Sequence, residues 1–198
     1  STQTLDAGSF YLAWEPGGDD LLLHRDAMLE LARDPLDLET RESLGEPGQS
    51  FLAPSWIPGT REALIATTSA TGNRLVRINV DTGEEFDLGP VSGTVGLVVA
   101  PDGSRALVAH GAAGTGDLAI ANRRVEAVTG ATEIIDLTTG ARELVSQGQA
   151  FWAEWTRDGS RLVLLQAAEG GTAALEWVVW EDGAVTRLGL FSPSPSFF

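Results

Sequence analysis

A short sequence block occurs four times along the chain, and this repeat limits the folds open to it more than any other feature. Each copy begins with Trp or another apolar residue, passes through a turn rich in Pro, Gly and Asp, and ends in a run of aliphatic residues. The copies begin at Trp14, Trp56, Val99 and Trp155, at spacings of 42, 43 and 56 residues. Such a period indicates that each repeat is one supersecondary unit.

A second turn follows each block at a similar distance. These turns are LDLET from Leu36, VDTGE from Val80, DLTTG from Asp136 and WEDGA from Trp180. The segments between the turns are short and rich in Val, Ile, Leu, Thr and Trp, which predicts strands joined by hairpins rather than helices. In the second copy we expect strands at residues 51–56, 63–68, 74–81 and 84–88.

Four strands in each copy predict an all-β protein, a β-propeller with four four-stranded antiparallel blades, because one such sheet is stabilised by stacking on its neighbours. We expect the blades at residues 9–48, 49–92, 93–148 and 149–190, with 191–198 beginning a further blade. Four blades are few for a self-contained propeller, so we expect a fragment of a larger one. The Asp and Gly residues of the turns then need no chemical role, because they supply the tight geometry between strands.

The block and the turn that follows it resemble the TolB-like β-propeller repeat of bacterial proteins, over essentially the whole chain. The matching residues are Trp14, Trp56, Pro101, Asp102, Gly103, Trp155, Asp158 and Gly159. The first two copies replace Asp-Gly by Gly-Gly and Gly-Thr, and the third has Val99 in place of Trp and extra residues around 111–129. Proteins similar to this serve as scaffolds, as periplasmic or surface binding modules and as gating domains on peptidases. The resemblance therefore implies a fold and an extracytoplasmic location, but no activity.

Composition argues against several partners. The chain has 13 basic residues, all of them Arg, against 28 acidic ones, and the net charge of −15 would repel nucleic acid. Its longest apolar stretches, such as residues 95–100 and 162–165, are far shorter than the ~20 residues of a membrane helix. The lack of Cys leaves the compartment open, and the lack of Lys is compatible with a thermophile. The chain starts at Ser1 with no leader following, so we expect it to begin within a longer polypeptide.

Little in the sequence indicates catalysis or metal binding. There is no G-x-S-x-G motif, and neither His24 nor His110 has a neighbouring nucleophile, which argues against a serine hydrolase. Two His and no Cys are too few for a typical zinc site, and no D-x-D-x-D-G calcium loop occurs. We expect no catalytic residue, no metal and no cofactor.

Aligning the four copies reveals a polar position at the end of the second strand. It is occupied by Arg25, Thr67, His110 and Gln166. In propellers the loops after these strands open on one face together with the connections between blades, so this position is a candidate ligand-binding surface. The alternative is that strand ends are polar simply because they meet water.

Two further features are candidates for binding. Glu154 is the only carboxylate among the residues that precede the four anchors, and we expect it to face a wet channel or to pair with an Arg. The insertion at 111–129 contains Arg123 and Arg124, which could bind a carboxylate-bearing ligand or an acidic partner, or could neutralise nearby carboxylates. The spacing of three between Trp177 and Trp180 does not match one face of a strand.

These observations indicate a non-catalytic β-propeller scaffold that binds a protein, a peptide or a small ligand. The alternative is an accessory propeller domain, gating or substrate-selecting, of a larger hydrolase such as a prolyl-oligopeptidase-type peptidase. Uncovered apolar faces on the terminal blades predict self-association or binding to the remaining blades of the same protein.

Overall fold

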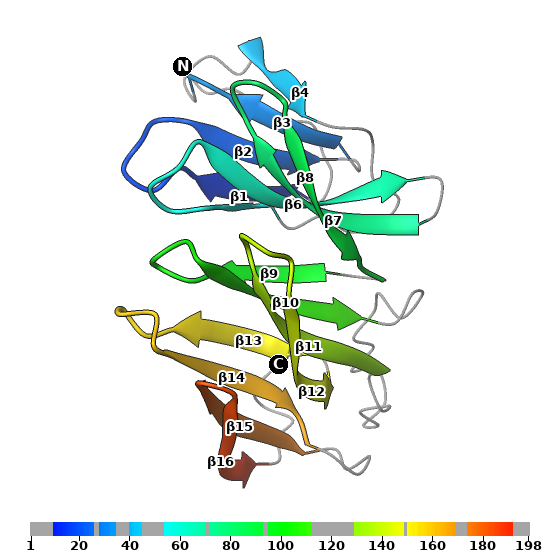
Figure 1. The fold of residues 1–198 in the computed structure, drawn as a ribbon, viewed down its shortest axis with the longest axis vertical. Coiled ribbons are helices and arrows are strands. Elements are labelled where there is room, and N and C mark those ends of the chain that lie inside the picture. Colours follow the sequence, from blue (N-terminus) through cyan, green and yellow to red (C-terminus); the bar gives the residue numbers. More distant parts are fainter. Residues whose placement is uncertain are drawn as a thin grey trace. The chain divides into compact units, whose positions relative to one another are not determined.

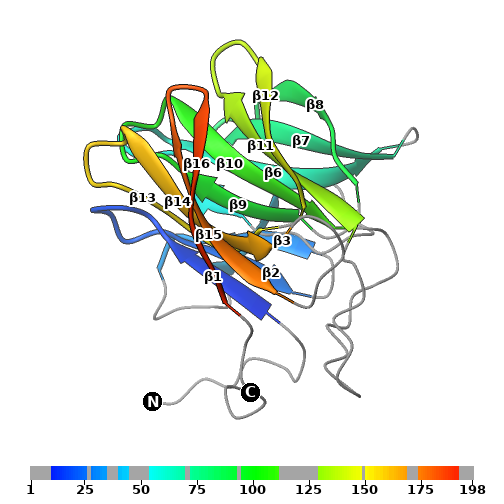
Figure 2. The same ribbon diagram turned by 90° about the horizontal axis from the view of Figure 1, so that it is seen from below.

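The chain folds into four sheets of four strands each. The computed structural model describes residues 10–25, 28–34, 40–44, 54–69, 72–92, 95–111, 129–148, 150–168 and 174–191. Within each sheet the strands follow one another in chain order and every neighbouring pair is antiparallel (Figures 1 and 2). This confirms the predicted all-β architecture. The described residues contain no helix long and apolar enough to cross a membrane.

The strand bounds follow the repeat. The first sheet consists of β1 (Phe10–Trp14), β2 (Leu21–Arg25), β3 (Met28–Ala32) and β4 (Glu42–Leu44). The second consists of β5 (Ser55–Trp56), β6 (Glu62–Ser69), β7 (Gly72–Asn79) and β8 (Glu85–Pro90). The third consists of β9 (Val95–Val99), β10 (Arg105–Gly111), β11 (Thr129–Asp136) and β12 (Arg142–Gly148). The fourth consists of β13 (Ala150–Trp155), β14 (Arg161–Ala167), β15 (Leu175–Glu181) and β16 (Ala184–Phe191).

The expected strands of the second copy agree with β6, β7 and β8 to within about two residues, a normal uncertainty for element boundaries. Residues 51–53, expected to begin β5, lie outside the described residues. Residue 191, expected to open a further blade, ends β16 instead, and 192–198 lie outside the described residues. The insertion falls between β10 and β11, at the end of the second strand of its sheet.

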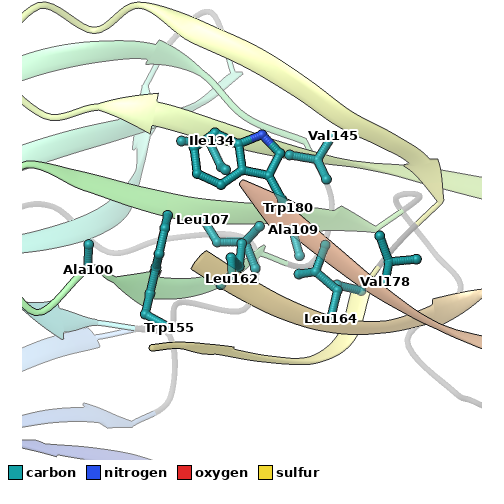
Figure 3. Close-up of a cluster of buried hydrophobic side chains, with 11 residues drawn as sticks. Ala100, Leu107, Ala109, Ile134, Val145, Trp155, Leu162, Leu164, Val178 and Trp180 are labelled. Carbon is teal, nitrogen blue, oxygen red and sulfur yellow. The ribbon is translucent and has the colours of Figure 1, made fainter. Parts of the chain in front are cut away.

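The chain divides into two compact units, Ser1–Val91 with the first two sheets and Ser92–Phe198 with the last two. In the first unit, Leu22 and Leu31 of one sheet share a buried apolar cluster with Ile65 and Val76 of the next. In the second unit, Leu107 and Ile134 of the third sheet share a cluster with residues of the fourth sheet, including Leu162, Leu164 and Val178 (Figure 3). Each unit is thus held together by one sheet face packed on the next.

The turns explain why two copies depart from the Asp-Gly pattern. In the first copy, the N–H of Gly18 donates to the carbonyl oxygen of Glu15 at 3.2 Å across Pro16 and Gly17, and Gly17 has φ +80°. Pro followed by a glycine with positive φ is the signature of a type II turn. In the third copy the positive φ lies one residue later, at Gly103, and Asp102 occupies the position before it. The two sequence variants therefore encode two turn types of the same length.

The turn aspartates have a structural role, as the sequence predicts. In the fourth copy, Asp158 accepts hydrogen bonds from the N–H and the hydroxyl of Ser160 and from the hydroxyl of Thr156. These donors, above all Thr156, lower the pKa of Asp158 to about 2. The carboxylate is therefore occupied by the turn itself.

Candidate functional site

The polar position at the end of the second strand is buried in the sheets where its side chain is described. Thr67, His110 and Gln166 are 9%, 8% and 3% exposed. The interpretation that these residues are polar because they meet water is therefore wrong for all three. The backbone of Arg25 pairs with Met28 at the equivalent place, but its side chain lies outside the described residues. Buried polar groups need partners, because leaving them unpaired is costly.

His110 finds its partners within the second unit. Its Nε2 lies 3.0 Å from Oε2 of Glu133, on the neighbouring strand β11, and its Nδ1 lies 3.5 Å from the backbone nitrogen of Ser92. The same Glu133 oxygen accepts a hydrogen bond from Nη1 of Arg142 at 3.2 Å. Arg142 therefore balances the charge of Glu133, and the carboxylate fixes the imidazole in one orientation.

Gln166 is held in a similar way in the fourth sheet. Its Nε2 donates to Oε1 of Glu176 at 2.9 Å, directly across the β14–β15 pair. The other oxygen of Glu176 lies 3.3 Å from Nε of Arg187, on β16. The Glu176 side chain is only 3% exposed, so its carboxyl group is buried between one amide and one guanidinium.

An ion pair between the third and fourth strands accompanies this position in three sheets. The pairs are Arg74–Asp87, Glu133–Arg142 and Glu176–Arg187. Thr67 lies directly across from Arg74. The ion pair of Arg74 with Asp87 raises the pKa of the Arg74 guanidinium. The described side chains thus form three separate polar clusters, one per sheet, rather than one hydrogen-bonded site.

The repeat alignment did not reveal these charged partners. In each of the three sheets the pairing between the third and fourth strands contains a register shift, at Leu75/Val76, near Thr132 and at Trp177/Val178. A bulge inserts one residue and turns the following side chains to the other face. The connection after the second strand also differs in length among the sheets. A constant spacing counted from the anchor therefore identifies the second strand but fails beyond it. Alignment of acidic and basic residues across the predicted hairpins is the signal that could have found them.

Hydrogen bonds from Thr132 fix the connection between the third and fourth sheets, near the end of the second strand. Thr132, which is fully buried, donates from its hydroxyl to the carbonyl oxygen of Gly148 at 2.8 Å. The hydroxyl also accepts a hydrogen bond from the N–H of Ala150 at 3.0 Å. One side chain therefore holds both ends of the link from β12 to β13, next to the polar cluster of His110.

The remaining predicted site residues have different outcomes. Glu154 is exposed and has no ion pair among the residues that the structure describes, so of its two expected environments the pairing with an Arg is absent and the side chain faces solvent. Arg123 and Arg124 lie outside the described residues. No group of three or more His, Asp or Glu side chains in the described part of the chain is placed to hold a metal ion.

Trp177 and Trp180 lie on opposite faces of β15, which explains their spacing of three residues. Trp180 is buried and packs edge-on against Trp155, with ring centroids 5.9 Å apart. Trp177 packs edge-on against Trp152 at 5.5 Å. Trp155 and Trp180 belong to the core of the second unit, whereas Trp152 is 44% exposed. The spacing of three in sequence reflects one aromatic pair on each face.

Comparisons with known proteins identify the fold. No family model matches the chain, and no curated protein matches it. Among solved structures, TolB from Acinetobacter baumannii has 14% sequence identity and a TM-score of 0.63, over 91% of this chain and 43% of that one. The tricorn protease has 11% identity and a TM-score of 0.63, over 93% and 18%.

A nidogen/laminin complex has 13% identity and a TM-score of 0.62, over 92% of this chain and 62% of that one. The chain spans less than two thirds of each of these three proteins. At such identities the similarity concerns the fold alone. The four sheets are therefore those of a β-propeller and match part of larger propellers.

Proposed function

We propose that this chain is a non-catalytic β-propeller scaffold that binds a protein, a peptide or a small ligand at the end where the second strands finish. The observation that carries the proposal is the set of buried polar groups at that end, Thr67, His110 and Gln166, each beside an ion pair of its own sheet. The insertion with Arg123 and Arg124 leaves the sheet at the same end, directly after β10. Loops set on a rigid scaffold are where binding residues concentrate.

The contacts of His110 support a non-catalytic role. A base of the Ser-His-Asp type needs one ring nitrogen on a carboxylate and the other on the nucleophile. His110 has a carboxylate at Nε2, but its Nδ1 faces the backbone N–H of Ser92 rather than a hydroxyl. The imidazole is thus enclosed by structural partners.

Binding can be tested with an immobilised array of acidic, neutral and basic peptides, followed by a titration of the tightest binder. We expect saturable binding of acidic peptides. Replacing Arg123 and Arg124 with Ala should weaken it by on the order of 1 kcal/mol or more and leave the melting temperature nearly unchanged. Thr138→Ala, in the exposed β11–β12 turn, is the matched control. Equal affinity in the double variant would refute the proposed site, and saturable binding to no peptide would exclude peptides as its ligands.

Catalysis can be tested directly with aminoacyl and dipeptidyl p-nitroanilides. We expect no release of p-nitroaniline above the buffer rate. Hydrolysis that His110→Ala abolishes would overturn the non-catalytic assignment, because the His110 imidazole has a carboxylate partner in Glu133.

The second candidate is an accessory propeller domain of a larger hydrolase. It is favoured by the similarity to the tricorn protease, of which this chain covers only 18%, so that a segment with this fold lies within a much longer protease chain. Reading the gene beyond this segment separates the two functions. A following G-x-S-x-G domain favours the hydrolase, whereas further propeller repeats alone favour the binding scaffold. An encoded secretion signal would support the extracytoplasmic location that we also propose.

A further inference from the structure

Within each unit, one Trp side chain fastens a sheet to the one before it. Nε1 of Trp56 donates to the carbonyl oxygen of Ala13 at 2.8 Å, and Nε1 of Trp155 donates to that of Val98 at 2.9 Å. Ala13 and Val98 occupy the same place in the repeat, one residue before the anchor. Both lie on the first strand of their sheet, which is an edge strand with free carbonyl groups. We call this contact the Trp joint.

An Arg covers the indole in both Trp joints. In the first unit, the guanidinium of Arg61 lies 5.7 Å from the centre of the Trp56 ring and pairs with Glu15 and Asp20 of the preceding sheet. In the second unit, Arg105 lies 5.5 Å from the Trp155 ring and donates to the carbonyl oxygen of Gly159 at 3.2 Å. Each joint therefore combines a buried indole, a backbone hydrogen bond and an Arg that bridges the two sheets.

The first sheet has the Trp of such a joint, but its indole N–H has no acceptor among the described residues. Trp14 occupies the anchor position, but it is 56% exposed, whereas Trp56 and Trp155 are 4% and 7% exposed. Leu12, on the same face of β1, is 47% exposed. Exposed aromatic and aliphatic side chains gathered on one face mark an interaction surface.

The fourth sheet has the other side of such a joint, namely an acceptor carbonyl group and an Arg. Glu154 stands one residue before the anchor on its edge strand β13, so its carbonyl group is equivalent to those of Ala13 and Val98. The Trp152 side chain is exposed on the same face as that of Glu154, beside Trp177. Arg161 is the repeat equivalent of Arg105, and its side chain is 55% exposed.

We propose that the first sheet of one copy of this chain docks on the fourth sheet of a second copy through a third Trp joint, formed between the two copies. In it, Trp14 donates to the carbonyl oxygen of Glu154, and Arg161 covers the indole and reaches the carbonyl oxygen of Gly18. The occupant is a second copy because the same chain carries both complementary halves. The repeat shows twice how the indole meets the carbonyl group, and the second unit shows how an Arg of the preceding sheet covers the indole. Charge favours the contact, since the turn that receives Arg161 carries Glu15, Asp19 and Asp20.

Two copies can form a closed ring if each donates its Trp14 to the fourth sheet of the other. A head-to-tail interface generates a ring when its rotation closes. Two chains with four blades each stay within the range of about four to eight blades that propellers have. The proposed assembly is therefore a ring of two copies with two identical joints.

The test is the mass of the 198-residue chain in solution, measured by sedimentation velocity over a range of concentrations. We expect a species of twice the 20.9 kDa chain mass. Trp14→Ala should raise the dimer dissociation constant at least tenfold, and Trp14→Phe by a smaller factor, since Phe keeps the apolar contact but has no N–H. Leu144→Ala, at an exposed position of β12, should leave the constant unchanged.

A charge exchange tests the geometry of the contact. Arg161→Glu should weaken association by placing a carboxylate against an acidic turn. Adding Asp19→Arg to it should restore association, because the double variant reproduces the pairing of Arg61 with Asp20 found in the first unit. Thermal unfolding of each variant separates loss of association from loss of folding, because the Arg161 side chain also pairs with Glu181 of its own sheet.

Four results would overturn the proposal. A monomer at every concentration would mean that no second copy covers Trp14. Species longer than two copies would exclude the closed ring. A dimer with the same dissociation constant in Trp14→Ala, or one that Asp19→Arg fails to restore in the Arg161→Glu background, would place the interface elsewhere.

Discussion

Replacing Trp155 with Phe isolates the hydrogen bond of a Trp joint from its apolar contact. The indole is 7% exposed, donates to the carbonyl oxygen of Val98 at 2.9 Å, and lies 5.5 Å from the Arg105 guanidinium. Phe removes the N–H and part of the ring but keeps an aromatic face for Arg105 and Trp180. The change therefore tests whether the backbone hydrogen bond contributes to the joint.

The magnitude follows from three losses. The hydrogen bond contributes about 1 kcal/mol net, the smaller ring forfeits roughly 0.5–1 kcal/mol of burial, and the cation–π contact weakens by a few tenths. We expect Trp155→Phe to lower the free energy of unfolding by about 2 kcal/mol. Trp155→Ala, which also leaves a cavity, should lower it by about 4 kcal/mol. Both are large fractions of the roughly 5–15 kcal/mol that stabilises a typical domain.

Urea unfolding followed by circular dichroism gives the total change, and hydrogen exchange reports the unit Ser92–Phe198 separately. Trp152→Phe is the matched control, because Trp152 lies on the same strand but is 44% exposed and belongs to the other face. It should change stability by less than about 0.5 kcal/mol. Equal effects of the two Phe substitutions would refute the claim that the joint depends on the indole N–H.

Two further changes test the polar contacts. Thr132→Val keeps the shape of the side chain but leaves the carbonyl oxygen of Gly148 and the N–H of Ala150 without their partner, so we expect a loss of about 2–3 kcal/mol in urea unfolding. Thr132→Ser should retain most of the stability, and a neutral Val substitution would contradict the role given to the hydroxyl. In the first unit, Arg61 and then Arg33 hold the pKa of Asp81 well below its usual range, since both guanidinium groups bond to the carboxylate. Because the folded-state pKa is lowered, this contribution is present above the ordinary Asp pKa of about 4 and is lost as the pH falls below it. The urea midpoint of the first unit should therefore decline below about pH 4, less steeply in Asp81→Asn, and a decline of equal steepness in both proteins would contradict the assignment to Asp81.

The parts of the fold predicted from sequence are those that depend on local patterns. Turns such as Pro16-Gly17 and Asp102-Gly103 mark the hairpins because few residue types fit their backbone angles. The alternation of apolar residues on either side of them then gives the strands. The same local counting identified Thr67, His110 and Gln166 as equivalent, which their pairing in the sheets bears out.

The environment of those residues was not predictable in the same way. Whether Gln166 meets water or Glu176 depends on the strand that pairs with it and on the sheet that covers it, neither of which is a local property. The unequal connections between second and third strands, together with the register shifts between third and fourth strands, also remove any fixed spacing from the anchors to Arg142 and Arg187. The environment of Glu154 likewise depends on the fold, since its exposure follows from which face of β13 it occupies.

The buried carboxylate of Glu176 is a feature that stability alone does not explain. An apolar pair of similar volume is often as stabilising as a buried ion pair, because the desolvation of both charges offsets their attraction. The sheets nevertheless place Glu176 almost fully inside and use Gln166 and Arg187 to hold it. Positions where a sequence departs from the most stable solution are where functional constraints are expected. The ion pair beside His110, next to the insertion that follows β10, is less buried, because the Glu133 and Arg142 side chains are 23% and 22% exposed. Glu176 is therefore the residue on which we base the proposed binding role of this end of the sheets.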